Sequence, residues 1–323
     1  MAIGRSLFRN NHRNQEYKDF GLSNKIAEQG SRFINRDGSF NVEKRGLPFH
    51  VRFSFYHTLI TMSWWKFNAI VLISYLIVNF VFGTIYYFIG METSMAGVVG
   101  TTAIEKYSEA LFFSIQTLTT VGYGRVSPIG LWSNVVAGLE SLLGLLAFAL
   151  ATGLLYGRFS RPVAHIVFSE NALIAPYKRD GKALMLRIAN AKNNQIMNMT
   201  AQLMMSWIET DNAETTRKFY TLPLEREMIN FMAMSWTIVH PIDENSPLWS
   251  ISKADFDAAD AEIMIVLSGF DETFAQTVHA RSSYKFYEVV WNAKFDNIFR
   301  KSENGRDTII DLDRIGAHTL LAE

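Results

Sequence analysis

Two long uncharged stretches limit what this chain can fold into more than any other feature of the sequence. The first runs from Phe67 to Met91, and the second runs from about Leu131 to Gly157 with Glu140 as its one charge. A helix of about 20 apolar residues spans the hydrocarbon core of a bilayer, whereas helices of globular proteins average about a dozen residues. The length therefore disfavours the alternative, a buried helix of a soluble protein. We predict two membrane-spanning helices.

The distribution of basic residues predicts the orientation of these spans. Residues 1–66 contain 11 Lys and Arg against five Asp and Glu, and Arg158 and Arg161 follow the second span. Residues 92–130 contain only two basic residues. Because basic residues accumulate on the cytoplasmic side of a membrane, we expect both termini in the cytoplasm and the connecting segment open to the outside.

The segment between the spans contains a short apolar helix pattern, Tyr107 to Leu118, followed directly by Thr119-Thr120-Val121-Gly122-Tyr123-Gly124. The last five residues match the run that strips water from potassium ions in potassium channels. Glycines allow alternate residues to adopt backbone angles that turn every carbonyl the same way. We expect a re-entrant helix, with a surface amphipathic helix as the alternative. The selectivity filter that binds K⁺ would be Thr120, Val121, Gly122, Tyr123 and Gly124.

The chain before the first span divides at about residue 46. Residues 1–46 are polar, mixed in charge and punctuated by glycines, and we expect them to be a flexible cytoplasmic N-terminus. Residues 47–162 would form the transmembrane pore domain. This domain would begin with a helix along the inner membrane face, because residues 50–63 place apolar side chains at helical intervals beside polar ones. The alternative is that these residues are the first turn of the first spanning helix.

After Pro162 the hydrophobic pattern changes from helical to alternating. Apolar side chains occupy every second position from Met197 to Trp207, and mostly polar ones lie between them, as in a half-buried strand. We predict an antiparallel β-sandwich over residues 163–300, followed by a C-terminal segment, 301–323. Further strands are predicted over residues 183–188, 218–224, 228–239, 263–267 and 275–281.

Several segments carry a specific resemblance: Val239–Trp249 (VHPIDENSPLW), Ser252–Phe256, Ala280–Tyr284, the filter run and Arg161-Pro162. In these segments the chain resembles inward-rectifier potassium channels, most of all the bacterial members, over about residues 45–300. The resemblance implies a homotetramer whose fold class is membrane α plus all-β. Each chain would contribute a two-transmembrane-helix potassium-channel pore domain with a re-entrant pore helix and filter. An immunoglobulin-like β-sandwich would follow as the cytoplasmic domain.

The resemblance also implies which residues of the second span line the pore or gate it. These are Gly144, Phe148 and Tyr156. Glu140 and Thr152 join them as predicted pore residues because all five follow one another at four-residue intervals and so stay near one face of the helix with a slow drift. Gly144 matches a glycine that lets the helix bend, with close helix packing as the alternative. Tyr156 matches a bulky side chain that narrows the inner mouth.

Glu140 needs its own explanation, because a carboxylate within a span is costly unless it faces water or a partner. We expect Glu140 below the filter, where it faces the cavity or the back of the filter. The alternative is a carboxylate near the helix end that is hydrogen-bonded to a neighbouring subunit.

In the cytoplasmic domain the resemblance implies a constriction of the conduction path. Strongly rectifying members hold polyamines on acidic residues at positions that are Phe148, Asn198 and Ser268 in this chain, so we expect weak rectification. The constriction loop matches Gly269, Phe270, Asp271, Glu272, Thr273, Phe274, Ala275 and Gln276.

Basic residues where the inner leaflet meets the protein could bind anionic phospholipids or phosphoinositides. Ordinary positive-inside charges are the alternative. The candidate headgroup ligands are His50, Arg52, Lys66, Arg158 and Arg161.

These features predict an inward-rectifier-type potassium channel in the bacterial inner membrane, with K⁺ as permeant ion, no cofactor, and polyamines, Ba²⁺ or Mg²⁺ as blockers. We do not expect an enzyme, because no nucleophile elbow, phosphate loop or paired metal motif is present. A net charge of zero argues against nucleic-acid binding. Two alternatives remain: a membrane-tethered β-sandwich binding module, which leaves the filter run without a purpose, and a poorly selective cation channel, which Tyr123 disfavours.

Overall fold

The chain forms two compact units. A computed structural model describes residues 32–42, 46, 48, 54–161, 164–178, 181–211, 214–232 and 234–321. The membrane unit is Arg45–Arg161, and the β unit combines Met1–Lys44 with Pro162–Glu323. The sequence of the β unit is therefore interrupted by the membrane unit.

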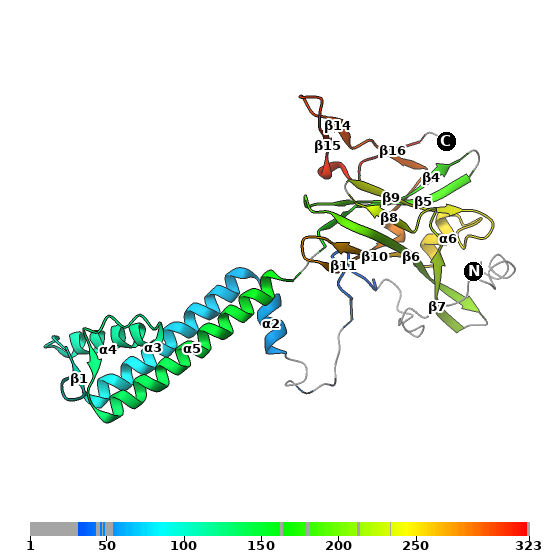
Figure 1. Cartoon of the computed structure of the whole chain (residues 1–323). Coiled ribbons are helices and arrows are strands. Elements are labelled where there is room, and N and C mark those ends of the chain that lie inside the picture. Colours follow the sequence, from blue (N-terminus) through cyan, green and yellow to red (C-terminus); the bar gives the residue numbers. More distant parts are fainter. Residues whose placement is uncertain are drawn as a thin grey trace. The chain divides into compact units, whose positions relative to one another are not determined.

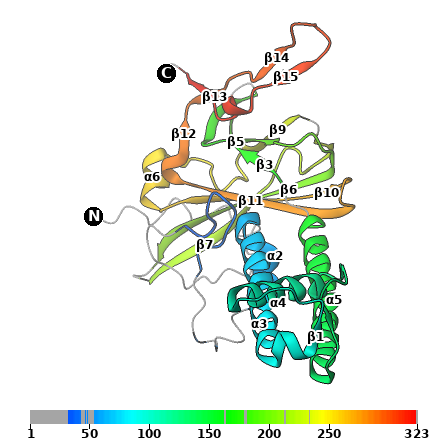
Figure 2. The same ribbon diagram turned by 90° about the vertical axis from the view of Figure 1, so that its left-hand side faces the viewer.

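The described residues of the membrane unit form four helices and one short strand pair. These are α2 (Phe55–Thr61), α3 (Trp64–Ser94), α4 (Ala103–Leu118) and α5 (Leu131–Phe159), with β1 (Met95–Ala96) paired to β2 (Ser127–Pro128). Figures 1 and 2 show α3 and α5 lying side by side, with α4 against one end of the pair. The helix α2 ends at Thr61 and is capped by Met62 before α3 begins, so the predicted interfacial helix is separate from the first span. Residues 50–53 of that prediction lie outside the described residues.

The helices α3 and α5 have the length and composition of membrane spans. They contain 31 and 29 residues, and within the described chain they are the two helices long and apolar enough to cross a membrane. Most of their apolar side chains are exposed, for example Leu72, Phe88 and Leu150. A core helix of a soluble protein would instead bury such side chains. The exposed apolar surface therefore suits a lipid environment or contacts with other membrane helices.

The helix α4 begins four residues before the predicted start because Thr102 caps it. The Thr102 hydroxyl accepts from the Glu105 amide at 3.2 Å, and the Glu105 carboxylate accepts from the Thr102 amide at 3.0 Å, which is a capping box. Ala110 and Phe113 of α4 pack with Tyr86 of α3 in a buried apolar cluster. This packing excludes the alternative of a free surface helix.

The β unit is a sandwich of two five-stranded sheets (Figure 1). The first sheet has the order β11-β10-β6-β7, with β8 beside β6, and the second has the order β12-β4-β5-β3, with β9 beside β5. The pairings within the two sheets are antiparallel except for β12 with β4. The bounds of these strands are β3 (Ile166–Phe168), β4 (Ala172–Tyr177), β5 (Gly181–Asn190), β6 (Ile196–Asp211), β7 (Glu214–Leu222), β8 (Met228–Phe231), β9 (Ser235–Ile242), β10 (Glu262–Asp271), β11 (Gln276–Lys285) and β12 (Val289–Trp291).

The structure contains the predicted strands, except that one of them is divided into two, and their apolar side chains pack in a common core. The predicted strand 228–239 is two strands, β8 and β9, which belong to different sheets. Leu184, Leu186 and Ile188 of β5 pack against apolar side chains of β6 and β10 in the main core. This core is the reason for the alternating pattern in the sequence, since one face of each sheet is buried.

The chain after residue 300 is part of the β unit. The strand β13 (Ala293–Phe295) pairs with β16 (His318–Leu320), and β14 (Phe299–Lys301) pairs with β15 (Thr308–Ile310). The helix α6 (Lys253–Ala258) and the short helices η1 (Phe286–Glu288) and η2 (Leu312–Arg314) complete the unit. The predicted boundary at residue 300 is therefore wrong, because strand pairing crosses it.

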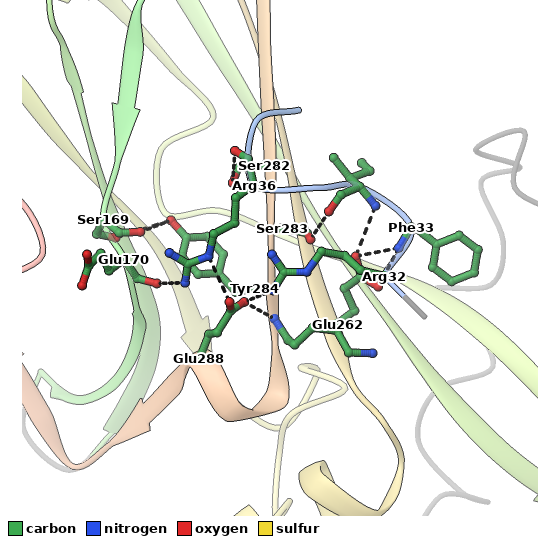
Figure 3. A network of polar contacts seen from close by, with 12 residues as sticks. Arg32, Phe33, Arg36, Ser169, Glu170, Glu262, Ser282, Ser283, Tyr284 and Glu288 are labelled. Carbon is green, nitrogen blue, oxygen red and sulfur yellow. Dashed lines mark hydrogen bonds and ion pairs between the residues drawn. The ribbon is translucent and has the colours of Figure 1, made fainter. Parts of the chain in front are cut away.

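An N-terminal segment, residues 32–42, is packed on the outer side of the first sheet (Figure 3). Phe33 and Ile34 are buried with Met204, Phe219 and Met264. The prediction of a flexible segment up to residue 46 is therefore wrong for residues 32–42. Their packing also explains why Met204 is buried although it lies on the face of β6 that the pattern predicts to be solvent-facing.

Polar contacts fix this N-terminal segment in place (Figure 3). The fully buried carboxylate of Glu262 accepts hydrogen bonds from the amides of Phe33, at 3.1 Å, and Ile34. Arg32 and Arg36 both pair with Glu288, which lies beyond the end of β11. A buried carboxylate is destabilising when it loses its partners. Loss of the N-terminal segment would therefore destabilise the first sheet at Glu262.

Candidate functional site

The residues from Thr120 to Gly124 have an unusual backbone. Every second residue lies in the left-handed region: Thr120 has φ 62°, Gly122 has φ 54° and Gly124 has φ 81°. Glycine adopts such angles freely, whereas threonine does so only at a cost of about 1–3 kcal/mol. Alternation of this kind turns successive carbonyls toward one side of the chain. The two glycines in the sequence indicated this backbone pattern at Gly122 and Gly124. The structure adds a third left-handed residue, Thr120.

The end of α4 anchors this run. The Gln116 carbonyl accepts hydrogen bonds from the amides of Val121, at 2.9 Å, and Gly122, at 3.3 Å. The Thr120 amide donates to the Thr117 carbonyl at 3.1 Å. The carbonyl end of a helix carries a partial negative charge, so a cation near this end would be stabilised.

An ion pair holds the chain that follows the run. Arg125 comes directly after Gly124, and its guanidinium lies 2.9 Å from the Glu109 carboxylate of α4. The same carboxylate accepts from the Val99 amide at 3.1 Å. Both ends of the run are therefore attached to α4. The sequence analysis did not predict this ion pair. The segment between the spans has few charges, and the presence of opposite charges at Glu109 and Arg125 could have indicated it.

The five predicted pore residues of α5 do not share one face. Phe148, Thr152 and Tyr156 are exposed, and the side chains of Phe148 and Tyr156 are each 74% exposed. Glu140 and Gly144 are buried against the other helices. Because an α-helix turns about 100° per residue, the direction at Tyr156 differs from that at Glu140 by about 160°. Each four-residue step turns the direction of the side chain by about 40°, so Glu140 and Tyr156, the first and last of the five predicted residues, point to nearly opposite sides of α5.

Glu140 lies inside the chain rather than on a surface. Its carboxyl group is fully buried and receives the Tyr86 hydroxyl of α3 at 2.6 Å, and it lies 2.5 Å from the Ser114 hydroxyl of α4. A group enclosed within one chain cannot line a pore, so these contacts disagree with the first of the two expected positions of Glu140, facing the cavity, and leave the second, at the back of the filter, as a prediction. The carboxyl group lies against Ser114 of α4, the helix that leads into the filter run. The alternative partner, a neighbouring subunit, is not needed.

At Gly144 the helix α5 lies close against the end of α4. A Cβ atom added at Gly144 would lie 2.2 Å from the Leu118 carbonyl oxygen. No side chain larger than hydrogen fits there without movement of the α4 end. This geometry favours close packing, the alternative reading of this glycine.

The predicted headgroup ligands differ in their availability. The Arg158 guanidinium donates to the carbonyls of Leu59, at 2.5 Å, and Met62, at 2.8 Å, and lies 4.5 Å from the centre of the Trp64 ring. It is therefore engaged at the junction of α2 and α3, contrary to the expectation of a free headgroup ligand. Lys66 and Arg161 are exposed. The remaining two, His50 and Arg52, lie outside the described residues.

The predicted constriction loop is the hairpin between β10 and β11. Its strand ends pair Asp271 with Gln276. The buried Asp271 carboxylate accepts from the Thr273 amide at 2.9 Å and from the Asn194 side chain at 2.7 Å. Glu272 is exposed. Asp271 therefore shapes the turn, whereas Glu272 is the carboxylate of this loop that can face solvent.

Comparison with known proteins identifies the family. Residues 166–320 match the model of the inward rectifier potassium channel C-terminal domain, and residues 74–161 match the ion channel model. Over 285 residues the chain is 35% identical to the inward rectifier potassium channel Kirbac3.1 of Paramagnetospirillum magnetotacticum, which covers 85% of this chain and 92% of that protein. The chain belongs to the inward rectifier potassium channel family.

A vertebrate member of the inward rectifier family is more distant. The chain is 28% identical over 309 residues to the ATP-sensitive inward rectifier potassium channel 12 of Gallus gallus, with 85% of this chain and 68% of that protein covered. Among solved structures, Spo0M of Bacillus subtilis matches with a TM-score of 0.22 and 11% identity over 40% of this chain and 50% of that one. A likeness this weak carries no argument about the fold.

The family assignment confirms the two-helix pore architecture with a cytoplasmic β-sandwich, and it confirms that the chain is an ion channel rather than an enzyme. It also agrees with two helices that are able to span a membrane. In the part of the chain that the structure describes, no group of three or more His, Asp and Glu side chains is placed to hold a metal ion.

Proposed function

We propose that this inward rectifier is a potassium-selective channel in which four copies of the chain conduct K⁺ passively through one pore. The observation that carries the proposal is the left-handed backbone at every second residue from Thr120 to Gly124. Carbonyls turned to one side can replace the water shell of a potassium ion. The anchoring of this run to the end of α4 supports the same reading, because the helix end favours a cation.

The exposure of the filter run supports assembly into a homotetramer. In one chain Val121 is 53% exposed and Tyr123 is 79% exposed. Irregular backbone at membrane depth is stable only where protein buries it or where it lines a water-filled path. Four copies around one axis would provide both, with the side chains packed outward and the carbonyls facing the ion. We place the protein in a bacterial inner membrane with both termini in the cytoplasm, on the distribution of basic residues.

Two finer properties belong to the same proposal. Phe148, Asn198 and Ser268 give the pore no acidic ring at the positions that bind polyamines in strong rectifiers, so rectification is weak. Lys66 and Arg161 are exposed basic residues at the ends of α3 and α5. They are the candidates through which anionic lipids modulate the channel.

Flux in liposomes tests the proposal. We expect purified protein in potassium-loaded liposomes to take up rubidium, to prefer it over sodium, and to be blocked by barium. Gly122→Asp should abolish this preference while the protein still inserts in the membrane. Gly305→Asp is the matched control, because Gly305 also has a positive φ, 67°, but lies in an exposed hairpin of the β unit.

The outcomes separate the alternatives. A monomeric protein without flux would favour a membrane-tethered binding module. Equal uptake of rubidium and sodium by the wild type would favour a poorly selective cation channel. Retained potassium preference in Gly122→Asp would refute the assignment of the filter.

A further inference from the structure

The carboxyl group of Glu140 lies at the meeting point of three helices. Tyr86 of α3 and Ser114 of α4 both contact it, and the Ser114 hydroxyl also lies 3.2 Å from the amide oxygen of Asn79 on α3. Glu140, Ser114 and Asn79 are almost completely buried. No Lys, Arg or His is among the described contacts of Glu140, and Tyr86 is the one titratable group that faces it. This cluster is therefore a closed network of polar groups between apolar helices.

The orientation of the Asn79 amide is fixed by a neighbouring carbonyl. The Asn79 amide nitrogen donates to the Tyr75 carbonyl at 2.7 Å. Exchanging the amide oxygen and nitrogen would place two acceptors against each other, so the amide oxygen must face Ser114. That oxygen needs a donor, and among the described contacts the Ser114 hydroxyl is the one that can supply it.

Counting hydrogens then decides the state of the carboxyl group. The Ser114 hydroxyl has one hydrogen but lies within hydrogen-bond distance of two acceptors, Asn79 and Glu140. If Glu140 is ionised, that hydrogen must go to one acceptor, and the other is left unpaired in a buried place. If Glu140 carries a proton, it donates to Ser114 and Ser114 donates to Asn79. The Asn79 oxygen, the Ser114 hydroxyl and both oxygens of Glu140 then each have a partner, and no unpaired charge is buried.

We propose that Glu140 is a neutral, protonated acid in the folded channel and that in this state it is a positioning residue for the pore helix. The inference rests on the proposed function, since the element that it positions carries the filter. Ser114 precedes Gln116 by two residues, and the Gln116 carbonyl holds the amides of Val121 and Gly122. A hydrogen bond from Glu140 to Ser114 therefore fixes the end of α4 against both long helices.

Glutamine distinguishes this proposal from a requirement for charge. In Glu140→Gln the amide oxygen can accept from Tyr86 and the amide nitrogen can donate to Ser114, which reproduces the pattern of the protonated acid. We expect Glu140→Gln to retain the preference for rubidium over sodium within about twofold, and Glu140→Ala to reduce it by about tenfold, because two hydrogen bonds are lost. Ser114→Ala, which removes one hydroxyl, should give an intermediate loss and provides a second variant if Glu140→Ala does not assemble.

Infrared spectroscopy reads the proton directly and does not depend on conduction. The difference spectrum between the wild-type channel and Glu140→Gln, at neutral pH in the same liposomes, should contain the carbonyl stretch of a protonated carboxyl group. Absence of this band, or a loss of preference in Glu140→Gln as large as that in Glu140→Ala, would overturn the proposal. A wild type that lacks potassium preference but has the band would refute the proposed function and leave the protonated state of Glu140 supported.

Discussion

Replacing Gly144 with alanine tests how the inner helix fits against the pore helix. The added Cβ would lie 2.2 Å from the Leu118 carbonyl oxygen, whereas carbon and oxygen atoms in contact are normally about 3.3 Å or more apart. The end of α4 would have to move by about 1 Å, and overpacking of this kind costs about 1–3 kcal/mol. Alanine in place of glycine stabilises the helix itself by about 1 kcal/mol. Because the obstacle is a backbone atom, which moves less easily than a side chain, we take the upper end of the overpacking cost. The net destabilisation is then about 2 kcal/mol per chain.

The measurement combines assembly and selectivity. The thermal midpoint for loss of the oligomer in detergent should fall for Gly144→Ala, and the preference for rubidium over sodium should fall with it, since Leu118 lies two residues before Thr120, the start of the filter run. Gly138→Ala and Gly153→Ala are matched controls on the same helix, because a Cβ at either position meets nothing within 4 Å in the chain. Both controls should be at least as stable as the wild type.

A hinge at Gly144 predicts the opposite sign. If the glycine serves to bend the helix, alanine should stiffen and stabilise α5, raise the thermal midpoint, and slow the flux without changing selectivity. That combination of results would refute the packing argument.

Three further predictions concern other parts of the molecule. Phe33→Ala should lower the free energy of unfolding of the β unit by about 3 kcal/mol, because a buried ring is lost; Phe40→Ala, at a half-exposed ring, should cost about 1 kcal/mol or less, and denaturant titration compares the two. Burial lowers the pKa of His240, whose ring contacts the Pro223 carbonyl at 2.6 Å. The unfolded chain therefore binds the proton first as the pH falls, so the β unit should lose up to about 1.4 kcal/mol per pH unit below about pH 6.5, and His240→Gln should remove this slope. Phe148→Asp should strengthen block by internal spermine about tenfold or more, since four carboxylates would each contribute up to about 1 kcal/mol; current recordings that show no gain would mean that this side chain does not face the pore.

Patterns that depend on one element were predictable from the sequence. The spans follow from uncharged length alone, and the alternation between Met197 and Trp207 identified β6, because burial of one sheet face sets the period. The run from Thr120 to Gly124 was noticed because its five residues match the run found in potassium channels, a match that rarely occurs by chance. These features need no knowledge of what packs against them.

Features that depend on two distant segments were missed. Met204 lies at a position of β6 that should face solvent, and only the docking of Phe33 explains its burial. The Asp37-Gly38 pair between Ile34 and Phe40 was a hairpin signal that could have indicated structure there. The shared face predicted for the five α5 residues failed for a different reason, since a four-residue spacing keeps residues on one face over two turns but not over four.

The discontinuous β unit has a consequence for biosynthesis. The amide of Phe33 is 229 residues away from its carboxylate partner Glu262, so at about 5–20 residues per second a ribosome makes that partner about 10–50 s later. During this interval α3 and α5 are synthesised and Phe33 and Ile34 stay open to chaperones and proteases. Folding of the β unit must therefore follow the synthesis of the membrane unit. A chain that stalls within the membrane segments leaves Phe33 and Ile34 without the sheet against which they pack.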